Sequence, residues 1–416
     1  MIMEILQFSY VQPYVIVFYS TNFDDVSIGT CTYYMEIKYK STYAAAKKVA
    51  DSISMHYCKH LNAAKANGEG DLANAPGVQI IEKIIDVAFW ASLRREEGIA
   101  TKISLAFLHP EQSGKPLLFA QRLAFNADVL TKLGPGVESA GVHVGIWHDE
   151  DGLYIWGTTN KLPQYCFVVD VSEPGLIVVK HRRAMGLAKF ANVAVLKGDQ
   201  VKIVDEECAT FPDTPSIVSA LLGTETSAVW NDPTNILIQI AVSMRAHKRG
   251  GILLVVPDEH ANWRNSIIHP MQYAIQPSFS GVADLGRVTE SNTSEIFWQN
   301  ALRREVSNIT GLTAVDGATI VNQSHELLAF GAKIARAQGA LPVDQIVMIE
   351  PIMGGRAKEV HPSSIGGTRH LSTAQFIHDQ RDAIGLVASQ DGYFTVFSWS
   401  DVAEKVQAHR IDILLI

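Results

Sequence analysis

Two segments near the start of the chain repeat apolar residues every three or four positions, as one face of an amphipathic helix does. The first segment runs from Tyr43 to Ala66 and follows Ser41 and Thr42, residue types that cap helix N-termini. The second runs from Val78 to Arg95. Between them, the glycine-containing stretch Asn67–Asp71 predicts a break. The pattern therefore predicts two consecutive helices.

From Lys102 to Val204 the pattern changes to short apolar runs separated by turn residues such as Glu173-Pro174-Gly175. Runs of this length and spacing predict a mostly antiparallel sheet that the two helices flank. We therefore predict one α+β domain over residues 41–225. The predicted strands are Ile103–Leu108, Gly141–Trp147, Leu153–Thr158, Cys166–Val171, Leu176–Lys180, Val193–Lys197 and Val201–Val204.

Beyond a join at Leu221–Thr226, helical and strand-like segments alternate without the regular rhythm of a doubly wound fold. The pattern predicts an α/β domain over residues 228–416, with a mixed sheet covered by helices. The predicted helices are Asn235–Ala246, Ser294–Ile309 and Thr373–Arg381. The predicted strands are Gly250–Pro257, Asp316–Val321, Leu327–Ala329, Gln345–Ile349, Ile384–Ser389 and Tyr393–Ser398.

Composition limits the classes of function. The chain has 416 residues, 47% of them hydrophobic and 19% charged, which suits two or three domains with substantial cores. A net charge of −8 gives no sign of a large nucleic-acid surface, and no apolar run is long enough for a transmembrane helix. The four cysteines lack paired metal-ligand spacing, which favours reduced thiols. We expect a cytoplasmic protein without nucleic-acid or membrane partners.

Residues 1–40 differ from the rest of the chain. They are rich in Tyr, Phe and Val and show little helical periodicity. Either they add one or two strands to the first domain, or they precede the functional start of the chain.

Two short stretches carry the strongest signs of chemistry. Gly366-Gly367-Thr368 opens a helical run, and a turn of this kind brings backbone N–H groups and the helix N-terminus close to an anion. Arg369 and His370 follow directly and could donate charge-assisted hydrogen bonds to phosphate. About fifty residues upstream, Asp316-Gly317-Ala318 begins a strand-like run. Each stretch alone also fits an ordinary turn or a capped helix start.

In combination these stretches resemble the diadenylate cyclase (DAC) domain family over about residues 228–416. Asp-Gly-Ala alone is a weak signal, but Asp-Gly-Ala followed at this distance by Gly-Thr-Arg-His is fairly specific. The segments that carry the resemblance are Arg249–Val256, Leu312–Ala318, Glu326–Ala332, Gly367–His370 and Ala383–Ser389, with the hairpin Gln390–Gly392.

The N-terminal half is similar to the presumed sensor domain, called DACNV, that precedes some of these cyclases. The likeness lies in Trp90–Gly98 and in Glu173–Arg183. This resemblance implies that an unidentified effector acts at the N-terminal domain and regulates the output of the C-terminal one.

The resemblance implies a reaction in which two ATP condense to cyclic di-AMP and release two pyrophosphates. It also implies Mg²⁺ or Mn²⁺, and a homodimer or higher homo-oligomer in which two cyclase domains meet face to face with one ATP each. Asp316 would hold the metal, and Asp316, Arg369 and His370 would be the catalytic residues. The implied nucleotide-binding residues are Gly317, Ala318, Gly366, Gly367, Thr368, Arg369, His370 and Ser389.

Two positions depart from the family pattern. Leu371 stands where a second arginine commonly follows the histidine, and Ser389-Gln390-Asp391 stands where Ser-Glu-Glu is common. A missing charged donor in a phosphate site typically costs a few kcal/mol of transition-state stabilisation. The candidates for compensation are Arg249, Arg356 and Lys358, and Asp391 is a candidate for the acidic group. The alternative function is therefore a cyclase-derived sensor that binds an adenine nucleotide with little or no turnover.

Two other clusters have competing interpretations. His143, His148 and Asp149 lie near a strand end and fit a turn at the sheet edge better than a metal site. The basic run Lys180–Arg183 fits a solvated strand end better than a site for an anionic effector.

Overall fold

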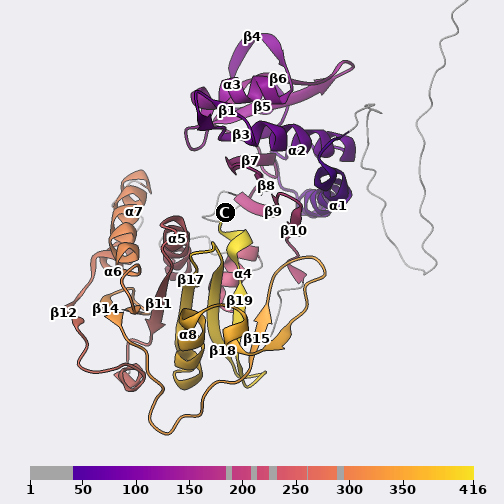
Figure 1. Ribbon diagram of the computed structural model, residues 1–416. Coiled ribbons are helices and arrows are strands. Elements are labelled where there is room, and N and C mark those ends of the chain that lie inside the picture. The colour runs from indigo at the N-terminus through magenta and orange to yellow at the C-terminus, as the bar shows by residue number, and fades with distance from the viewer. Residues whose placement is uncertain (1–40, 184–189, 208–212, 224–231, 260, 288–294) are drawn as a thin grey trace, which may run out of the picture. The chain divides into compact units, whose positions relative to one another are not determined.

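The structure, a computed structural model, describes residues 41–183, 190–207, 213–223, 232–259, 261–287 and 295–416. Two large sheets organise these residues, one in each half of the chain, and each sheet has its own covering helices (Figure 1). Residues 1–40, whose role the sequence leaves open, lie outside the described residues. The structure thus combines an α+β half with a mixed α/β half, as the sequence predicts.

The N-terminal half contains an eight-stranded sheet with the order β10-β9-β8-β7-β3-β5-β6-β4. Among its described strands only β3 and β5 pair in parallel, so the sheet is mostly antiparallel as predicted. A small separate hairpin joins β1 to β2. The strands are β1 Arg95–Glu96, β2 Ile99–Ala100, β3 Ile103–Phe107, β4 Leu117–Ala124, β5 His143–Asp149, β6 Gly152–Thr159, β7 Phe167–Glu173, β8 Leu176–Arg182, β9 Phe190–Lys197 and β10 Gln200–Ile203. The helices are α1 Ala44–Ala66, α2 Val78–Ser92, η1 Pro110–Gln112 and α3 Ala127–Val137.

Helices α1, α2 and α3 cover one face of this sheet. Val49, Ile53 and Tyr57 on α1 are fully buried, and they join alternate residues of β3, β7 and β8 in one apolar cluster. The two predicted helices are therefore confirmed. Helix α3 and strand β4 were not predicted, because α3 contains the helix-breaking sequence Gly134-Pro135-Gly136 and β4 is mostly exposed.

The C-terminal half contains a nine-stranded sheet with the order β12-β14-β13-β11-β17-β18-β19-β15-β16. The pairs β11–β13 and β15–β19 are parallel and the other described pairs are antiparallel. The strands are β11 Gly251–Val256, β12 Tyr273–Phe279, β13 Ala318–Asn322, β14 Leu327–Ala332, β15 Ile346–Ile349, β16 Lys358–Val360, β17 Ile384–Ala388, β18 Phe394–Ser400 and β19 Lys405–Arg410.

Helices cover both faces of this second sheet, as predicted (Figure 1). Helices α5 and α7 pack on one face with residues such as Leu253 and Leu386, whereas α8 packs on the opposite face with Leu254 and Val387. Strand β11 is buried along its whole length, which explains its unbroken apolar sequence. The helices are α4 Ser216–Leu222, α5 Pro233–Ala246, η3 Ala261–Ser266, α6 Gly281–Gly286, α7 Glu295–Leu312, η5 Pro362–Ser364, α8 Thr368–Asp379 and η6 Asp412–Leu414.

Strand β19 was missed because its interior positions are polar. Gln407 and His409 are buried, and a hydrogen bond of 2.9 Å joins His409 Nε2 to Gln407 Oε1. A strand that buries a hydrogen-bonded polar pair does not show the alternation by which strands are recognised.

The two halves share an apolar cluster. Leu176, Val178 and Val195 face away from α1 and α2 and join residues of α4, α5 and η6. The Asn192 side chain adds a hydrogen bond of 2.7 Å to the Ile413 carbonyl.

Candidate functional site

Strand register brings the two predicted stretches to the same edge of the nine-stranded sheet. Strand β11 lies between β13, where Ile252 pairs with Ala318, and β17, where Gly251 pairs with Ala388. Asp316 therefore lies just before the paired part of one neighbour, and Ser389 lies just after the paired part of the other. The starts of β11 and β13 and the end of β17 together form this edge.

Asp316 forms an ion pair that the sequence did not suggest. Because Ala318 pairs with Ala332 across β13 and β14, Lys333 lies opposite the Asp-Gly turn. Its Nζ lies 2.5 Å from Asp316 Oδ2 and 3.2 Å from the Asp316 carbonyl oxygen. The Asp316 side chain is nevertheless 93% exposed. In the sequence, the only sign of this ion pair is that Lys333 directly follows the strand that pairs with β13.

The electrostatics of Asp316 also link it to Arg369. The hydrogen bond and the charge of Lys333 lower the pKa of Asp316, and the charge of Arg369 lowers this pKa further. Lys333 is therefore the ion-pair partner of the Asp316 carboxylate, and Arg369 acts on the same charge from a greater distance. Asp316 and Arg369 are thus within electrostatic reach of one another.

The start of α8 presents backbone N–H groups at the same edge. Gly367 is the N-cap residue and makes no side-chain capping bond, and both Gly367 and Thr368 are exposed. Gly366 has no room for a side chain, because a Cβ there would lie 2.1 Å from His370 Nδ1. A helix N-terminus with accessible amides favours an anion. The predicted helix start at Thr373 was five residues too late.

Arg369 packs against the backbone where β11 begins. A Cβ on Gly250 would lie 2.9 Å from Arg369 Nη1, and Gly250 has a φ of +72°, which favours glycine. The guanidinium therefore rests on the turn that precedes β11. This contact and the positive φ explain the glycine at position 250, whereas a Cβ on Gly251, the first residue of β11, would collide with Thr313.

The structure places His370 inside the fold, under the turn that the sequence assigned to phosphate binding. Its ring is only 3% exposed and lies beneath Gly366, with Nε2 3.5 Å from Thr395 Oγ1. Burial, helped by the charges of Arg410 and Arg369, lowers its pKa to about 4, so the ring is neutral at pH 7. His370 supports the turn from inside, and Arg369 is the residue that supplies charge there.

Three other predicted residues contribute shape or position. Gly317 has a φ of +122°, and a Cβ there would lie 2.4 Å from the Gly331 carbonyl carbon. Ala318 is completely buried in the core, which corrects its prediction as a nucleotide contact. Ser389 lies at the edge, but its Oγ accepts a hydrogen bond of 3.2 Å from the Asp391 N–H within the hairpin turn.

The structure separates the candidates for compensating the missing arginine. Arg249 is exposed and precedes Gly250 at the edge. Lys358 lies on β16, which is five strand positions from β11, or roughly 24 Å at about 4.8 Å per strand. Lys358 is therefore too far away within one protomer, whereas Lys333 is already at the edge. Arg356 lies in the loop that leads into β16.

The edge suits a hard divalent cation that arrives with a nucleotide. Mg²⁺ usually binds through one or two carboxylates together with substrate phosphates and water. Asp316 offers one ionised, exposed carboxylate beside an anion-binding helix start. The donor set fits Mg²⁺ or Mn²⁺ in this mode.

The structure places His143, His148 and Asp149 on β5, an interior strand of the eight-stranded sheet, which corrects the prediction of a turn at the sheet edge. His143 is buried, with Nδ1 2.7 Å from Ser104 Oγ, and the His148 ring stacks on Phe107 at 5.9 Å. Asp149 forms an ion pair with Arg122. These partners differ, and within the described residues the three side chains do not form a group of metal ligands.

Comparison with known families gives one match. Residues 70–160 match the family model of the probable sensor domain DACNV. The matched residues include α2, β3, β5 and β6, so the sensor domain lies in the eight-stranded sheet and its helices. No curated protein matches the chain. Within the described residues, no helix is both long and apolar enough to cross a membrane.

The basic run Lys180–Arg183, on the sheet that carries the sensor domain, is not a solvated strand end, which corrects that prediction. Lys180 forms an ion pair with Asp170, and His181 is buried. Arg183 donates hydrogen bonds to the carbonyls at the C-terminal end of α4, including one of 3.0 Å to Ala220. Cations at this end of a helix satisfy its last carbonyls.

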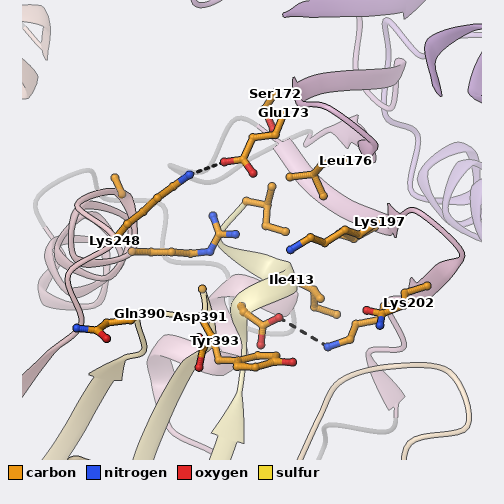
Figure 2. Close-up of a pocket in the computed structure, with 17 residues that line it drawn as sticks. Ser172, Glu173, Leu176, Lys197, Lys202, Lys248, Gln390, Asp391, Tyr393 and Ile413 are labelled. Atoms are coloured by element: carbon orange, nitrogen blue, oxygen red, sulfur yellow. Dashed lines mark hydrogen bonds and ion pairs between the residues drawn. The ribbon is translucent and has the colours of Figure 1, made fainter. Parts of the chain in front are cut away.

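A pocket of about 320 Å³ lies between the sheet of the sensor domain and the C-terminal half (Figure 2). Its lining includes Lys197 from β9, Arg245 from α5 and Tyr393 from the β17–β18 turn. Lys248 Nζ lies 2.5 Å from Glu173 Oε1, so an ion pair joins the two sides of the pocket. The lining thus carries charges of both signs, with four cationic residues and the carboxylates of Glu173, Asp391 and Asp412.

Proposed function

We propose that this chain is a diadenylate cyclase that condenses two ATP to cyclic di-AMP and two pyrophosphates. The observation that carries the proposal is that the Asp316 turn before β13 and the Gly250 turn before β11, against which Arg369 packs, lie at the same end of two neighbouring strands, with the start of α8 beside them. One side of this edge offers a carboxylate, and the other offers a cation and backbone N–H groups. The match to a probable sensor domain, of a type associated with diadenylate cyclases, supports the same function.

The proposed chemistry is an in-line displacement at the α-phosphate. The 3′-oxygen of one ATP forms a bond to the α-phosphorus of the other, the bond to pyrophosphate breaks, and a second such step closes the ring. Catalysis of this kind depends mainly on positioning and on neutralisation of charge. Asp316 accepts the proton of the attacking hydroxyl, while Arg369 and the amides of Gly367 and Thr368 hold the phosphates.

The proposal gives Lys333 and the metal related roles at Asp316. When bound, Mg²⁺ or Mn²⁺ neutralises phosphate charge and is held by Asp316. Lys333 now pairs with that carboxylate, and its charge can turn to a phosphate oxygen when the nucleotide enters. His370 keeps the Gly366-Gly367 turn in place, because it fills the space beneath it.

Two protomers are required by this chemistry. Each proposed site holds one ATP, and each 3′-hydroxyl must reach a phosphate on the other nucleotide. Face-to-face association of two cyclase-like domains therefore belongs to the proposal.

Regulation by the sensor domain has a physical route through the pocket. Lys248 lines the pocket, and two residues later Gly250 carries the Arg369 guanidinium. The turn after Ser389 contributes Gln390 to the pocket, and the Gln390 side chain donates a hydrogen bond of 3.3 Å to the Arg249 carbonyl. A change at the pocket therefore acts on segments that also form the proposed site.

The test is product formation by the full-length protein. Purified protein with ATP and Mg²⁺ or Mn²⁺ should yield cyclic di-AMP and pyrophosphate, measured by chromatography of labelled nucleotide. Asp316→Asn keeps the size of the side chain but removes its charge, and we expect at least a 100-fold loss of activity, about 2.7 kcal/mol. Asp344→Asn is the matched control, because Asp344 is an exposed aspartate on the loop before β15.

A wild-type protein that binds ATP and forms no product with either metal would overturn the enzymatic part of the proposal. That outcome would support the second candidate, a nucleotide-binding sensor without turnover. Leu371 in the first turn of α8 and the Lys333–Asp316 ion pair favour this alternative, since one cation is missing and another is already engaged. The alternative predicts thermal stabilisation by ATP without release of pyrophosphate.

A further inference from the structure

A second group of candidate ligands lies in the N-terminal half, far in sequence from the nucleotide edge. His56 and His60 on α1 and Glu206 after β10 each offer one ligand atom, and these three atoms lie within 4.8 Å of one another. In the described part of the chain no other group of His, Cys, Asp and Glu residues meets this condition. Neither the sensor-domain match nor the sequence motifs involve these residues.

The spacing of the two histidines suits a metal. Residues four apart lie on the same face of a helix, so both imidazoles project in one direction. Their ring centroids are 4.3 Å apart. Two histidines at this spacing on one helix are a recurrent way of binding zinc.

Glu206 completes a triangle of ligands. His60 Nε2 lies 3.4 Å from Glu206 Oε1. Two ligands of a tetrahedral zinc ion, each about 2.0–2.1 Å from the metal, are separated by about 3.3 Å. The separation of His60 and Glu206 therefore already matches such a site, and a small rotation of His56 would bring its nitrogen into the same sphere.

A third imidazole borders the two on α1. The His181 ring lies beside both histidines, with centroid distances of 6.1 Å to His56 and 5.7 Å to His60. Neutral imidazole with a free lone pair is the form that coordinates a metal.

We propose that His56, His60 and Glu206 bind one divalent transition-metal ion of the zinc class. Two nitrogens and one carboxylate oxygen are a donor set for Zn²⁺ and its neighbours, whereas Mg²⁺ and Ca²⁺ require oxygen donors. Three protein ligands leave a fourth position to water or to another group, as in open zinc sites. The site lies on α1 and on the segment that follows β10, and it shares no residue with the nucleotide edge.

An ordinary ion pair between His60 and Glu206 is the competing explanation. It accounts for the 3.4 Å contact, but it gives no reason for a second imidazole from the next helical turn or for the adjacent His181. A metal accounts for all three side chains together.

The place of Glu206 gives the metal a structural consequence. The preceding residue, Asp205, donates its backbone N–H to the Pro351 carbonyl at 3.1 Å, and Val204 forms an isolated bridge with Ile352. Segment 204–206 therefore touches both α1 and the C-terminal half. A metal bound to Glu206 and α1 would restrain this segment.

Metal titration of the full-length protein tests the proposal. The protein is stripped with a chelator and titrated with Zn²⁺, and with Co²⁺ as a spectroscopic probe, in a buffer that contains millimolar Mg²⁺ to occupy the nucleotide edge. We expect one equivalent to bind, with visible Co²⁺ bands typical of a low-coordination nitrogen and oxygen site. His56→Gln and His60→Gln should each weaken binding at least 100-fold, and Glu206→Gln should weaken it at least 10-fold.

Matched controls separate the site from its surroundings. Glu207→Gln alters the adjacent carboxylate, which is exposed and pairs with Lys59, and His109→Gln alters an imidazole at η1. Both should bind metal like the wild type. Absence of a stoichiometric site, or equal binding by the His60→Gln and His109→Gln proteins, would overturn the proposal.

Folding of each variant is checked by circular dichroism without metal. The wild type should gain thermal stability when Zn²⁺ is added, and a folded His60→Gln protein should not. A variant that fails to fold is replaced by His60→Asn, which has to meet the same criterion. Loss of cyclase activity in the Asp316→Asn protein leaves this metal site intact, so the two proposals fail independently.

Discussion

The two candidate sites are built in opposite ways. In the N-terminal half, the ring nitrogens of His56 and His60 gather with the Glu206 carboxylate in a partly buried cluster. In the C-terminal half, Asp316 is exposed and charged at a sheet edge, and Lys333 and Arg369 hold its charge. The difference follows from the ligands that each site suits. A transition metal binds neutral imidazole, whereas a nucleotide phosphate and its hard cation need exposed charges and backbone N–H groups.

Single buried histidines occur in both halves, and three of those that the structure describes lie in the C-terminal half. Burial lowers the pKa of His325, His370 and His409 to about 4. An unfolded chain binds these protons near pH 6.5, so the stability that the neutral rings provide is complete above that pH. It is lost as the pH falls from about 6.5 towards 4.

The largest predicted effect is therefore acid destabilisation of the protein. Each such histidine changes the free energy of unfolding by about 1.4 kcal/mol per pH unit in that window. The three together therefore change it by several kcal/mol per pH unit. Denaturant unfolding at pH 7.5, 6.0 and 5.0 measures this slope. In His409→Gln, the slope of the unfolding free energy against pH should fall by the contribution of roughly one proton. In His109→Gln it should remain unchanged. A free energy of unfolding that stays constant from pH 7.5 to 5.0 would contradict the prediction.

A second test concerns the backbone at the nucleotide edge. Gly317→Ala should destabilise the protein by about 2–3 kcal/mol, because φ is +122° and the new Cβ would collide with the Gly331 carbonyl group. We expect thermal unfolding at a lower temperature, by roughly 5–10 °C, together with weaker ATP binding. Gly70→Ala in the N-terminal half is the control, since a Cβ there meets nothing within 4 Å. Equal melting temperatures for the two variants would show that the turn is not constrained.

The fold could be predicted where apolar residues recur with the period of a buried helix or strand. Helix α1 and strand β11 are buried on the faces that their sequences indicate. Strand β19 escaped prediction because it buries Gln407 and His409, and α3 escaped because it contains Pro135. In each case a tertiary environment overrides the local signal.

The candidate sites differ in the same respect. Asp316 and Arg369 belong to contiguous motifs, so the sequence could suggest their meeting, and strand register then accounts for it. Lys333 could not be assigned, because its partner is known only once β13 and β14 are paired. The cluster of His56, His60 and Glu206 joins residues about 150 positions apart, and no local motif in the sequence indicates it.

The smallest predicted effect tests whether the edge lacks one cation. Leu371 lies in the first turn of α8 and is 36% exposed, so an arginine there can extend towards the phosphates without disturbing the core. Leu371→Arg should raise the turnover of ATP by up to 10-fold, about 1.4 kcal/mol, since a new donor is not positioned as well as one built into the site. The measurement is the initial rate of cyclic di-AMP formation at saturating ATP.

The same substitution places a positive charge near a helix N-terminus, which costs about 0.3–1 kcal/mol of stability. A lower melting temperature with a higher rate would thus separate catalysis from stability. Leu371→Gln is the matched control, because it makes the position polar without adding charge, and its rate should equal that of the wild type. A rate that is unchanged by arginine would mean that Arg369 and Lys333 already supply the charge this edge requires, and the exposed carboxylate, rather than the number of cations, would then limit the site.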